Sequence, residues 1–168
     1  TTLSILAQHV DSIPSGAHTG HILAESVHAN GAKGTLLNHS ERRMLPSDLG
    51  PTIERLRKND MIVILCVRNA YEARQYKRWK PDFIALEPQE LIGSGISVAT
   101  ARPQLITESV EAAQPIPVLV GAGIHDPKDI NIALFLGAKG VLVASDILLA
   151  KNPKREFVRL LDGFGNKH

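Results

Sequence analysis

Two side chains suited to acid–base chemistry follow short apolar segments of the chain. Glu87 comes directly after Phe83–Leu86, and His39 comes shortly after Gly34–Leu37. A carboxylate at the end of a buried strand is desolvated, which favours its protonated form and raises its basicity. A neutral imidazole donates a hydrogen bond to a carbonyl oxygen and stabilises an enediolate. The two residues therefore offer a base and a neutral hydrogen-bond donor at the ends of two predicted strands.

The residues beside this pair are expected to set its geometry. Ser40 is predicted to cap the next helical turn, which would place His39 at a helix N-terminus. The positive end of the helix dipole would then disfavour protonation of the imidazole. Pro88 restricts Glu87 to extended backbone geometry and so sets how the chain leaves the strand.

Three further segments offer unhindered backbone N–H groups. They are Gly93-Ser94-Gly95, Gly121-Ala122-Gly123, and Ala144-Ser145 at the start of a predicted short helix. Backbone donors that converge at one edge of a sheet suit a phosphate group. The sequence therefore predicts a phosphate-binding rim.

Six short apolar runs would position these groups. Each run is too short for a buried helix and most lack alternation, which is typical of parallel strands buried on both faces. The predicted strands are Leu3–Ala7, Gly34–Leu37, Met61–Val67, Phe83–Leu86, Pro117–Val120 and Gly140–Ala144. Apolar residues at helical spacing fill the intervening segments, which indicates an α/β protein. Periodicity alone leaves an open doubly wound sheet and a (β/α)8 barrel as alternatives.

Composition narrows the possible partners. The chain has 168 residues, a formal net charge of +2 and one cysteine, Cys66. So weak a charge imbalance, without a basic tract, argues against nucleic acid. No segment approaches the roughly 20 apolar residues of a membrane helix, and nothing is typical of a signal peptide. We therefore expect a single domain over residues 1–168, no membrane contact and a cytoplasmic location.

The sequence gives no sign of a metal or cofactor. His18 and His21 have no third ligand nearby, so we expect no metal site. The run Gly121-Ala122-Gly123 is not a dinucleotide fingerprint, because Asp126 stands where a third small residue is needed.

Five motifs resemble those of triosephosphate isomerases of the short, archaeal type, in the order and spacing of that family. Asn38-His39-Ser40-Glu41-Arg42-Arg43 resembles the family's histidine loop. Glu87-Pro88, followed by Leu91-Ile92-Gly93-Ser94-Gly95, resembles its glutamate and closing phosphate loop. Val120–Ile124 and Gly140–Ser145 resemble its last two phosphate loops. Ala7–Asp11 with Gly16–Gly20 resembles its third strand and dimer loop.

The resemblance implies interconversion of dihydroxyacetone phosphate and glyceraldehyde 3-phosphate in glycolysis and gluconeogenesis, without a cofactor. Glu87 would move the proton and neutral His39 would polarise the carbonyl, which are the established roles in that family. Pro88 would be the hinge of a lid spanning 88–98. Glu41 would support the site by pairing with a lysine, and Thr19 would reach the neighbouring subunit of a homodimer or homotetramer.

The resemblance also implies that the chain supplies six of the eight units of a (β/α)8 barrel, strands three to eight of the family. At about 30 residues per unit, roughly 60 residues of the family pattern are unmatched. The unmatched part carries a lysine that contacts the substrate. Three alternatives remain open: the chain is part of a longer one, a second chain completes it, or it is a genuine small relative that lacks this part. The alternative function is a non-catalytic phosphate-binding barrel, or a fragment that associates with another chain.

Overall fold

A computed structural model of the protein describes residues 3–88 and 97–165. The strands are β1 (Leu6–Ala7), β2 (Gly34–Leu37), β3 (Ile62–Val67), β4 (Phe83–Leu86), β5 (Val118–Val120) and β6 (Gly140–Val141). The α-helices are α1 (Ala24–Ala29), α2 (Pro46–Lys58), α3 (Ala70–Tyr76), α4 (Val98–Ala101), α5 (Pro103–Ala113), α6 (Pro127–Phe135), α7 (Ser145–Leu148) and α8 (Pro153–Leu161). The 3₁₀ turns among the described residues are η1 (Lys77–Trp79) and η3 (Asp162–Phe164).

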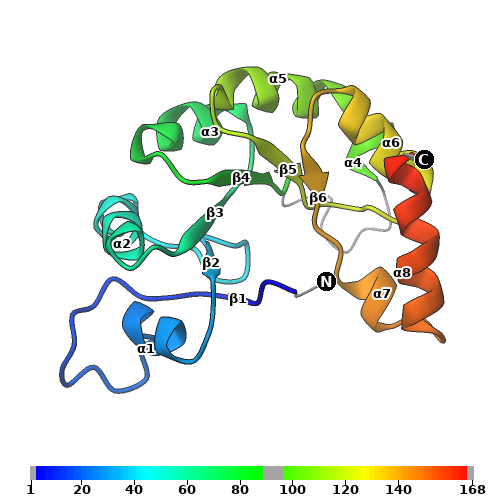
Figure 1. The fold of residues 1–168 in the computed structure, drawn as a ribbon. Coiled ribbons are helices and arrows are strands. Elements are labelled where there is room, and N and C mark those ends of the chain that lie inside the picture. Colours follow the sequence, from blue (N-terminus) through cyan, green and yellow to red (C-terminus); the bar gives the residue numbers. More distant parts are fainter. Residues whose placement is uncertain (1–2, 89–96, 166–168) are drawn as a thin grey trace.

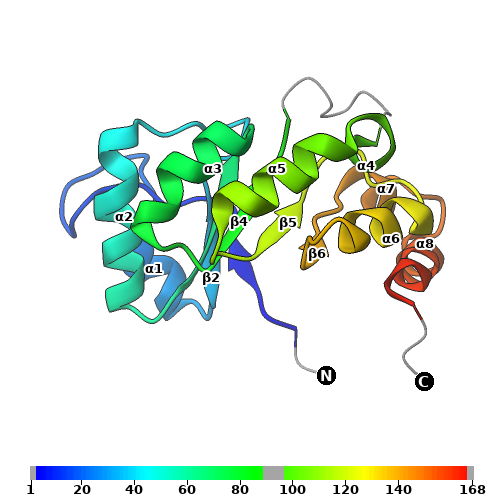
Figure 2. The ribbon, with the colours of Figure 1, turned by 90° about the horizontal axis from the view of Figure 1, so that it is seen from above.

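The described strands form one parallel sheet in sequential order, from β1 to β6. A doubly wound sheet would reverse its strand order at a switch point, so this order excludes that alternative. The sheet curls, with helices such as α3, α5 and α6 around its convex side (Figure 1). Helices α3 and α5 lie side by side on that side (Figure 2). The prediction of a partial (β/α)8 barrel with six βα units is confirmed.

The two strands at the ends of the sheet are shorter than predicted. Pairing is limited to Leu6–Ala7 in β1 and to Gly140–Val141 in β6. Each of these strands has one neighbour in the sheet, so each lacks the hydrogen bonds that a second neighbour would add. The side chains of Leu3 and Ile5, which precede β1, are exposed.

Side chains alternate between the two faces of the curled sheet. In β3, Val63 and Leu65 face outward and pack against residues of the surrounding helices. Ile64 and Cys66 face inward, where they form a separate cluster with Ala85 of β4. Because alternate residues share a face, the inward row of β4 continues from Ala85 to Glu87, beyond the end of the strand.

Local sequence explains where the helices begin and end. Asp126 caps α6, as predicted, and its side chain accepts a hydrogen bond from the Lys128 backbone N–H at 2.8 Å. Pro127 occupies the first position of that helix, where its missing N–H costs nothing. Gly31 and Gly137 follow α1 and α6 with φ of 92° and 101°, a left-handed conformation that glycine adopts without strain.

The prediction that Ser40 caps a helix is wrong. The segment after His39 is a turn, closed by the Arg42 N–H donating to the His39 carbonyl at 2.9 Å, and α2 begins only at Pro46. Asn38 explains the difference. Its φ is 61°, and its side chain donates to the Cys66 carbonyl at 2.9 Å and accepts from the Met44 N–H at 3.0 Å. These bonds tie the loop across the sheet, so His39 does not lie at a helix N-terminus.

A buried carboxylate on α3 also holds this loop. Glu72 accepts two hydrogen bonds from Arg43, at 3.0 and 3.1 Å, while Arg43 donates to the Asn38 carbonyl at 2.9 Å. Arg68 donates to the same carboxylate through its backbone and its guanidinium. Burial by itself raises the pKa of Glu72, but the hydrogen bonds from Arg68 and the charge of Arg43 outweigh it and lower the pKa.

This carboxylate makes the stability of the fold depend on pH. Because the pKa of Glu72 is lowered in the folded protein, its contribution is fully present above the usual value of 4.5 and is lost as pH falls through the lowered pKa. We expect Glu72→Gln to reduce the free energy of unfolding by about 2 kcal/mol at neutral pH. Urea unfolding at neutral pH and at about pH 3 measures this, and the difference between the proteins should shrink at the lower pH.

The exposed Glu108 of α5 supplies the control, because Glu108→Gln should leave stability unchanged at both pH values. A Glu72→Gln effect of the same size at both pH values would show that the charge of the carboxylate does not hold the loop.

Candidate active site

The barrel brings Glu87 and His39 together at the carboxyl ends of β4 and β2. Glu87 Oε2 lies 3.5 Å from His39 Nε2. The Glu87 N–H donates to the Val67 carbonyl at 2.8 Å, so the backbone of Glu87 is still held against β3. Glu87 as a whole residue is 5% exposed, and the His39 side chain is more accessible at 29%. A small molecule at the mouth of the barrel therefore has access to the imidazole beside a nearly buried carboxylate.

The surroundings of Glu87 make it a stronger base than a surface carboxylate. Burial raises the pKa of Glu87, against opposing contributions from His39, a Cys66 hydrogen bond and Arg43. Its Oε2 is buried and accepts no hydrogen bond from the described residues. This oxygen is therefore unsolvated and unsatisfied, so taking up a proton is favourable.

A backbone contact fixes the tautomer of His39. The Glu41 N–H donates to His39 Nδ1 at 3.3 Å. Nδ1 must present its lone pair to accept this bond, so in the neutral ring the proton is on Nε2, the nitrogen that faces Glu87. The Glu41 carboxylate lies 3.7 Å from Nδ1 and is largely exposed. Its predicted pairing with a lysine stays a prediction. Ser40 lies in the turn beside His39.

Gly121 and Cys66 enclose the Glu87 side chain. A Cβ atom on Gly121 would lie 2.8 Å from both Cγ and Oε1 of Glu87, closer than a Cβ atom approaches a non-bonded neighbour in proteins. Cys66 lies beside the carboxylate, and burial followed by the Glu87 charge raises the pKa of this thiol well above its usual value. Sequence reasoning assigned Gly121 to phosphate and missed this steric role. The inward alternation of β3, β4 and β5 is the signal that could have revealed it.

Free backbone donors lie beyond β5 and β6. The N–H groups of Ala122 and Gly123, and those of Ser145 and Asp146, donate to no acceptor among the described residues. Gly123 has a φ of 63°, which turns the chain sharply after β5. Ala144 immediately precedes α7, whose first-turn N–H groups have no partner within the helix. These amides are available to an anion, and the phosphate site expected at this rim stays a prediction.

The other predicted site residues are placed as follows. Pro88 is buried directly after Glu87, and Gly93 and Ser94 lie outside the described residues. At the far end of the predicted lid, the Val98 N–H donates to the Ala122 carbonyl at 3.5 Å. Thr19 is exposed in the loop between β1 and α1, so it is accessible to a neighbouring subunit, though its role there stays a prediction.

Within residues 3–88 and 97–165, no three His, Cys, Asp or Glu side chains lie together in a way that could hold a metal ion. Over the same ranges, no helix is long and apolar enough to cross a membrane.

Solved structures support the fold. The chain is similar to thiamine phosphate pyrophosphorylase from Pyrococcus furiosus, with a TM-score of 0.65 and 18% identity over 84% of this chain and 63% of the other. It is also similar to a FabK mutant from Thermotoga maritima, with a TM-score of 0.57 and 22% identity over 74% of this chain and 39% of the other. At these identities the likeness concerns the fold alone.

Sequence relatives give the family. The family model for triosephosphate isomerase matches residues 1–163. The chain is 43% identical to triosephosphate isomerase of Methanothermus fervidus, over 95% of this chain and 73% of that protein. It is 44% identical to the enzyme of Methanothermobacter thermautotrophicus, over 95% of this chain and 71% of that protein. The arrangement of Glu87 and His39 agrees with these matches, and the chain belongs to the triosephosphate isomerase family.

Proposed function

We propose that this chain carries the proton-transfer centre of a triosephosphate isomerase, which interconverts dihydroxyacetone phosphate and glyceraldehyde 3-phosphate. The observation that carries the proposal is the 3.5 Å approach of the buried Glu87 carboxylate to Nε2 of His39. The named relatives are longer than this chain, which spans about three quarters of their length, so isomerase activity is part of the proposal.

Glu87 acts as the base. It removes a proton from the carbon next to the substrate carbonyl, which leaves an enediolate, and it returns the proton to the neighbouring carbon. Its buried position supports this role, because a desolvated carboxylate is more basic than one in water. The same buried position keeps water from competing for the proton.

His39 acts as the electrophile. The Glu41 N–H occupies its Nδ1, so Nε2 carries the proton and donates to the oxygen that becomes negative in the enediolate. A neutral imidazole suits this step, because its N–H stabilises the developing negative charge by a hydrogen bond and places no full positive charge in the site.

The amides beyond β5 and β6 bind the substrate phosphate. Ala122, Gly123 and Ser145 offer backbone N–H groups on the same rim as Glu87, and Gly93 and Ser94 of the lid complete the set. Binding the phosphate at a distance from the reacting carbons orients them against the base, which lowers the entropic part of the barrier. Closure of the lid at Pro88 excludes water from the enediolate.

We also propose a location, a metabolic role and an oligomeric state for the enzyme. The enzyme works in the cytoplasm, in glycolysis and gluconeogenesis, as a homodimer or homotetramer in which Thr19 contacts the neighbouring subunit. The relatives named triosephosphate isomerase support the reaction, and the exposed position of Thr19 supports the contact.

Two substitutions test the proton-transfer centre. Glu87→Asp withdraws the carboxylate by one methylene group, and His39→Gln removes the imidazole. We expect each to lower kcat for glyceraldehyde 3-phosphate by about 10²- to 10⁴-fold, which is the usual contribution of a positioned acid or base. A coupled assay of triose phosphate interconversion measures this.

Glu108→Asp on α5 and His28→Gln on α1 are the matched controls, because both residues are exposed on helices and neither belongs to the proposed site. Turnover that survived Glu87→Asp unchanged would refute the mechanism. An unmutated protein that binds phosphate without turnover would instead favour the non-catalytic binding function.

The close contact of Gly121 with Glu87 gives a separate test. Gly121→Ala would place Cβ against Glu87 Cγ and Oε1, so the carboxylate must move away from His39. We expect kcat to fall by about 10²-fold, because a displacement of about 1 Å is enough for such a loss. Kinetics measured together with the Glu87 carboxyl carbon resonance connect the loss to the displacement. A full kcat with an unchanged resonance would contradict the steric role of Gly121.

A further inference from the structure

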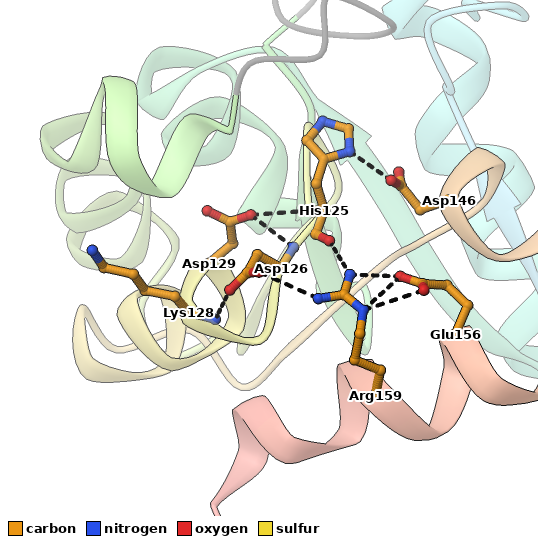
Figure 3. Close-up of polar contacts among 7 residues, drawn as sticks. All are labelled: His125, Asp126, Lys128, Asp129, Asp146, Glu156 and Arg159. Atoms are coloured by element: carbon orange, nitrogen blue, oxygen red, sulfur yellow. Dashed lines mark hydrogen bonds and ion pairs between the residues drawn. The ribbon is translucent and has the colours of Figure 1, made fainter. Parts of the chain in front are cut away.

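A histidine outside the proton-transfer centre links the two phosphate-binding loops. His125 follows the loop after β5, and Asp146 lies in the first turn of α7, after β6. His125 Nδ1 and Asp146 Oδ1 are 2.7 Å apart (Figure 3). This distance is short for a nitrogen–oxygen hydrogen bond and typical of a charge-assisted one. The contact therefore joins two consecutive βα units at the rim where the free amides lie.

The backbone of His125 is fixed from α6 and α8. Arg159 of α8 donates to the His125 carbonyl at 2.5 Å, and Glu156 holds the same guanidinium at 2.6 Å. The Asp129 carboxylate of α6 accepts from the N–H groups of His125 and Asp126, at 3.1 and 3.0 Å. Figure 3 shows these contacts around one loop. The main chain of His125 is therefore a rigid support.

The side chain of His125 depends on Asp146. Its second ring nitrogen, Nε2, is buried and bonds to no group among the described residues. Asp146 is therefore the polar partner that sets the orientation of the ring within the part of the chain that the structure describes.

Helix α7 has few contacts of its own to stabilise it. It spans Ser145–Leu148, about one turn, and Ala144 before it provides no side-chain cap. So short a helix is marginal by itself, because nucleation costs more than one turn of hydrogen bonds returns. Leu148 and Leu149 at its end are exposed, so little apolar packing holds that end. The bond to His125 is the one side-chain hydrogen bond that α7 makes within the described residues.

The charge of Asp146 is a second reason for the contact. The backbone N–H of Asp146 is one of the free donors, so the Asp146 carboxylate lies near the place where a phosphate would bind. An unpaired negative charge on that carboxylate would repel the phosphate. In the structure the carboxylate is bonded to the His125 ring, which supplies an N–H donor to that charge.

We propose that His125 is a positioning residue for the substrate phosphate. Through its bond to Asp146, it holds the amides of Ser145 and Asp146 at a fixed separation from those of Ala122 and Gly123, and it shields the phosphate from the Asp146 charge. This inference rests on the proposed isomerase function. It concerns phosphate affinity and leaves proton transfer to Glu87 and His39.

A double-mutant cycle on the full chain tests the inference. We expect His125→Ala to raise the KM for glyceraldehyde 3-phosphate about tenfold, the effect of roughly one such hydrogen bond, with kcat within about twofold. The apparent Kd for inorganic phosphate should rise by the same factor. In an Asp146→Ala background, His125→Ala should have no further effect, because its partner is already gone. His125→Gln, which keeps an N–H donor, should restore most of the affinity.

His28→Ala on α1 is the control, since it removes an exposed histidine and should leave KM unchanged. Circular dichroism establishes that each variant is folded, and His125→Gln with Asp146→Asn replaces the alanine cycle if His125→Ala does not fold. If the unmutated chain neither turns over substrate nor binds phosphate, the proposed function fails and this inference with it. If the unmutated chain is active and His125→Ala leaves KM unchanged, or raises it equally in both backgrounds, this inference alone is overturned.

Discussion

Alternation of side chains along a curled parallel sheet is the constraint on which this structure depends. Inward-facing residues of neighbouring strands line the interior, and where the strands end, the next inward positions open onto the mouth of the barrel. Cys66 is the last inward residue of β3, and Glu87 and Gly121 directly follow β4 and β5. A glutamate there is surrounded by other backbones and is desolvated by the same packing that forms the core. The desolvation of the Glu87 carboxylate therefore follows from the inward position that the strand register gives this residue.

Hydrogen bonds and an ion pair hold the loop that carries His39. The loop after β2 carries His39, and it is held by Asn38 and by the pairing of Arg43 with Glu72 on α3. Arg43 also lies close enough to Glu87 to oppose the rise of its pKa. Arg43 therefore connects the position of His39 to the basicity of Glu87, and the two properties cannot be adjusted independently through this residue.

Much of the fold could be predicted from the sequence, because the apolar runs are short and are separated by segments of helical period. The strands Gly34–Leu37 and Phe83–Leu86 match the prediction at both ends. Placing Glu87 and His39 on one rim needed only the rule that parallel strands end at the same edge. Ser40 was misjudged because the path of the loop is set by Asn38 bonding across to Cys66, a contact between residues distant in the sequence. The steric role of Gly121 and the bond from His125 to Asp146 are likewise tertiary. Strand alternation indicates which face Gly121 lies on, but neither contact can be read from the residues next to it in the sequence.

The sequential order of the sheet has a consequence for how stability is distributed. Strands β2 to β5 each bond to a neighbour on both sides, whereas β1 and β6 each bond to one. Backbone amides in these middle strands are therefore the most protected from exchange with solvent. Glu87 follows β4 and His39 follows the end of β2, so both are carried by strands with a neighbour on each side. The carboxylate and the imidazole are thereby attached to the parts of the described sheet that open least, which keeps the distance between them constant while the surrounding loops move.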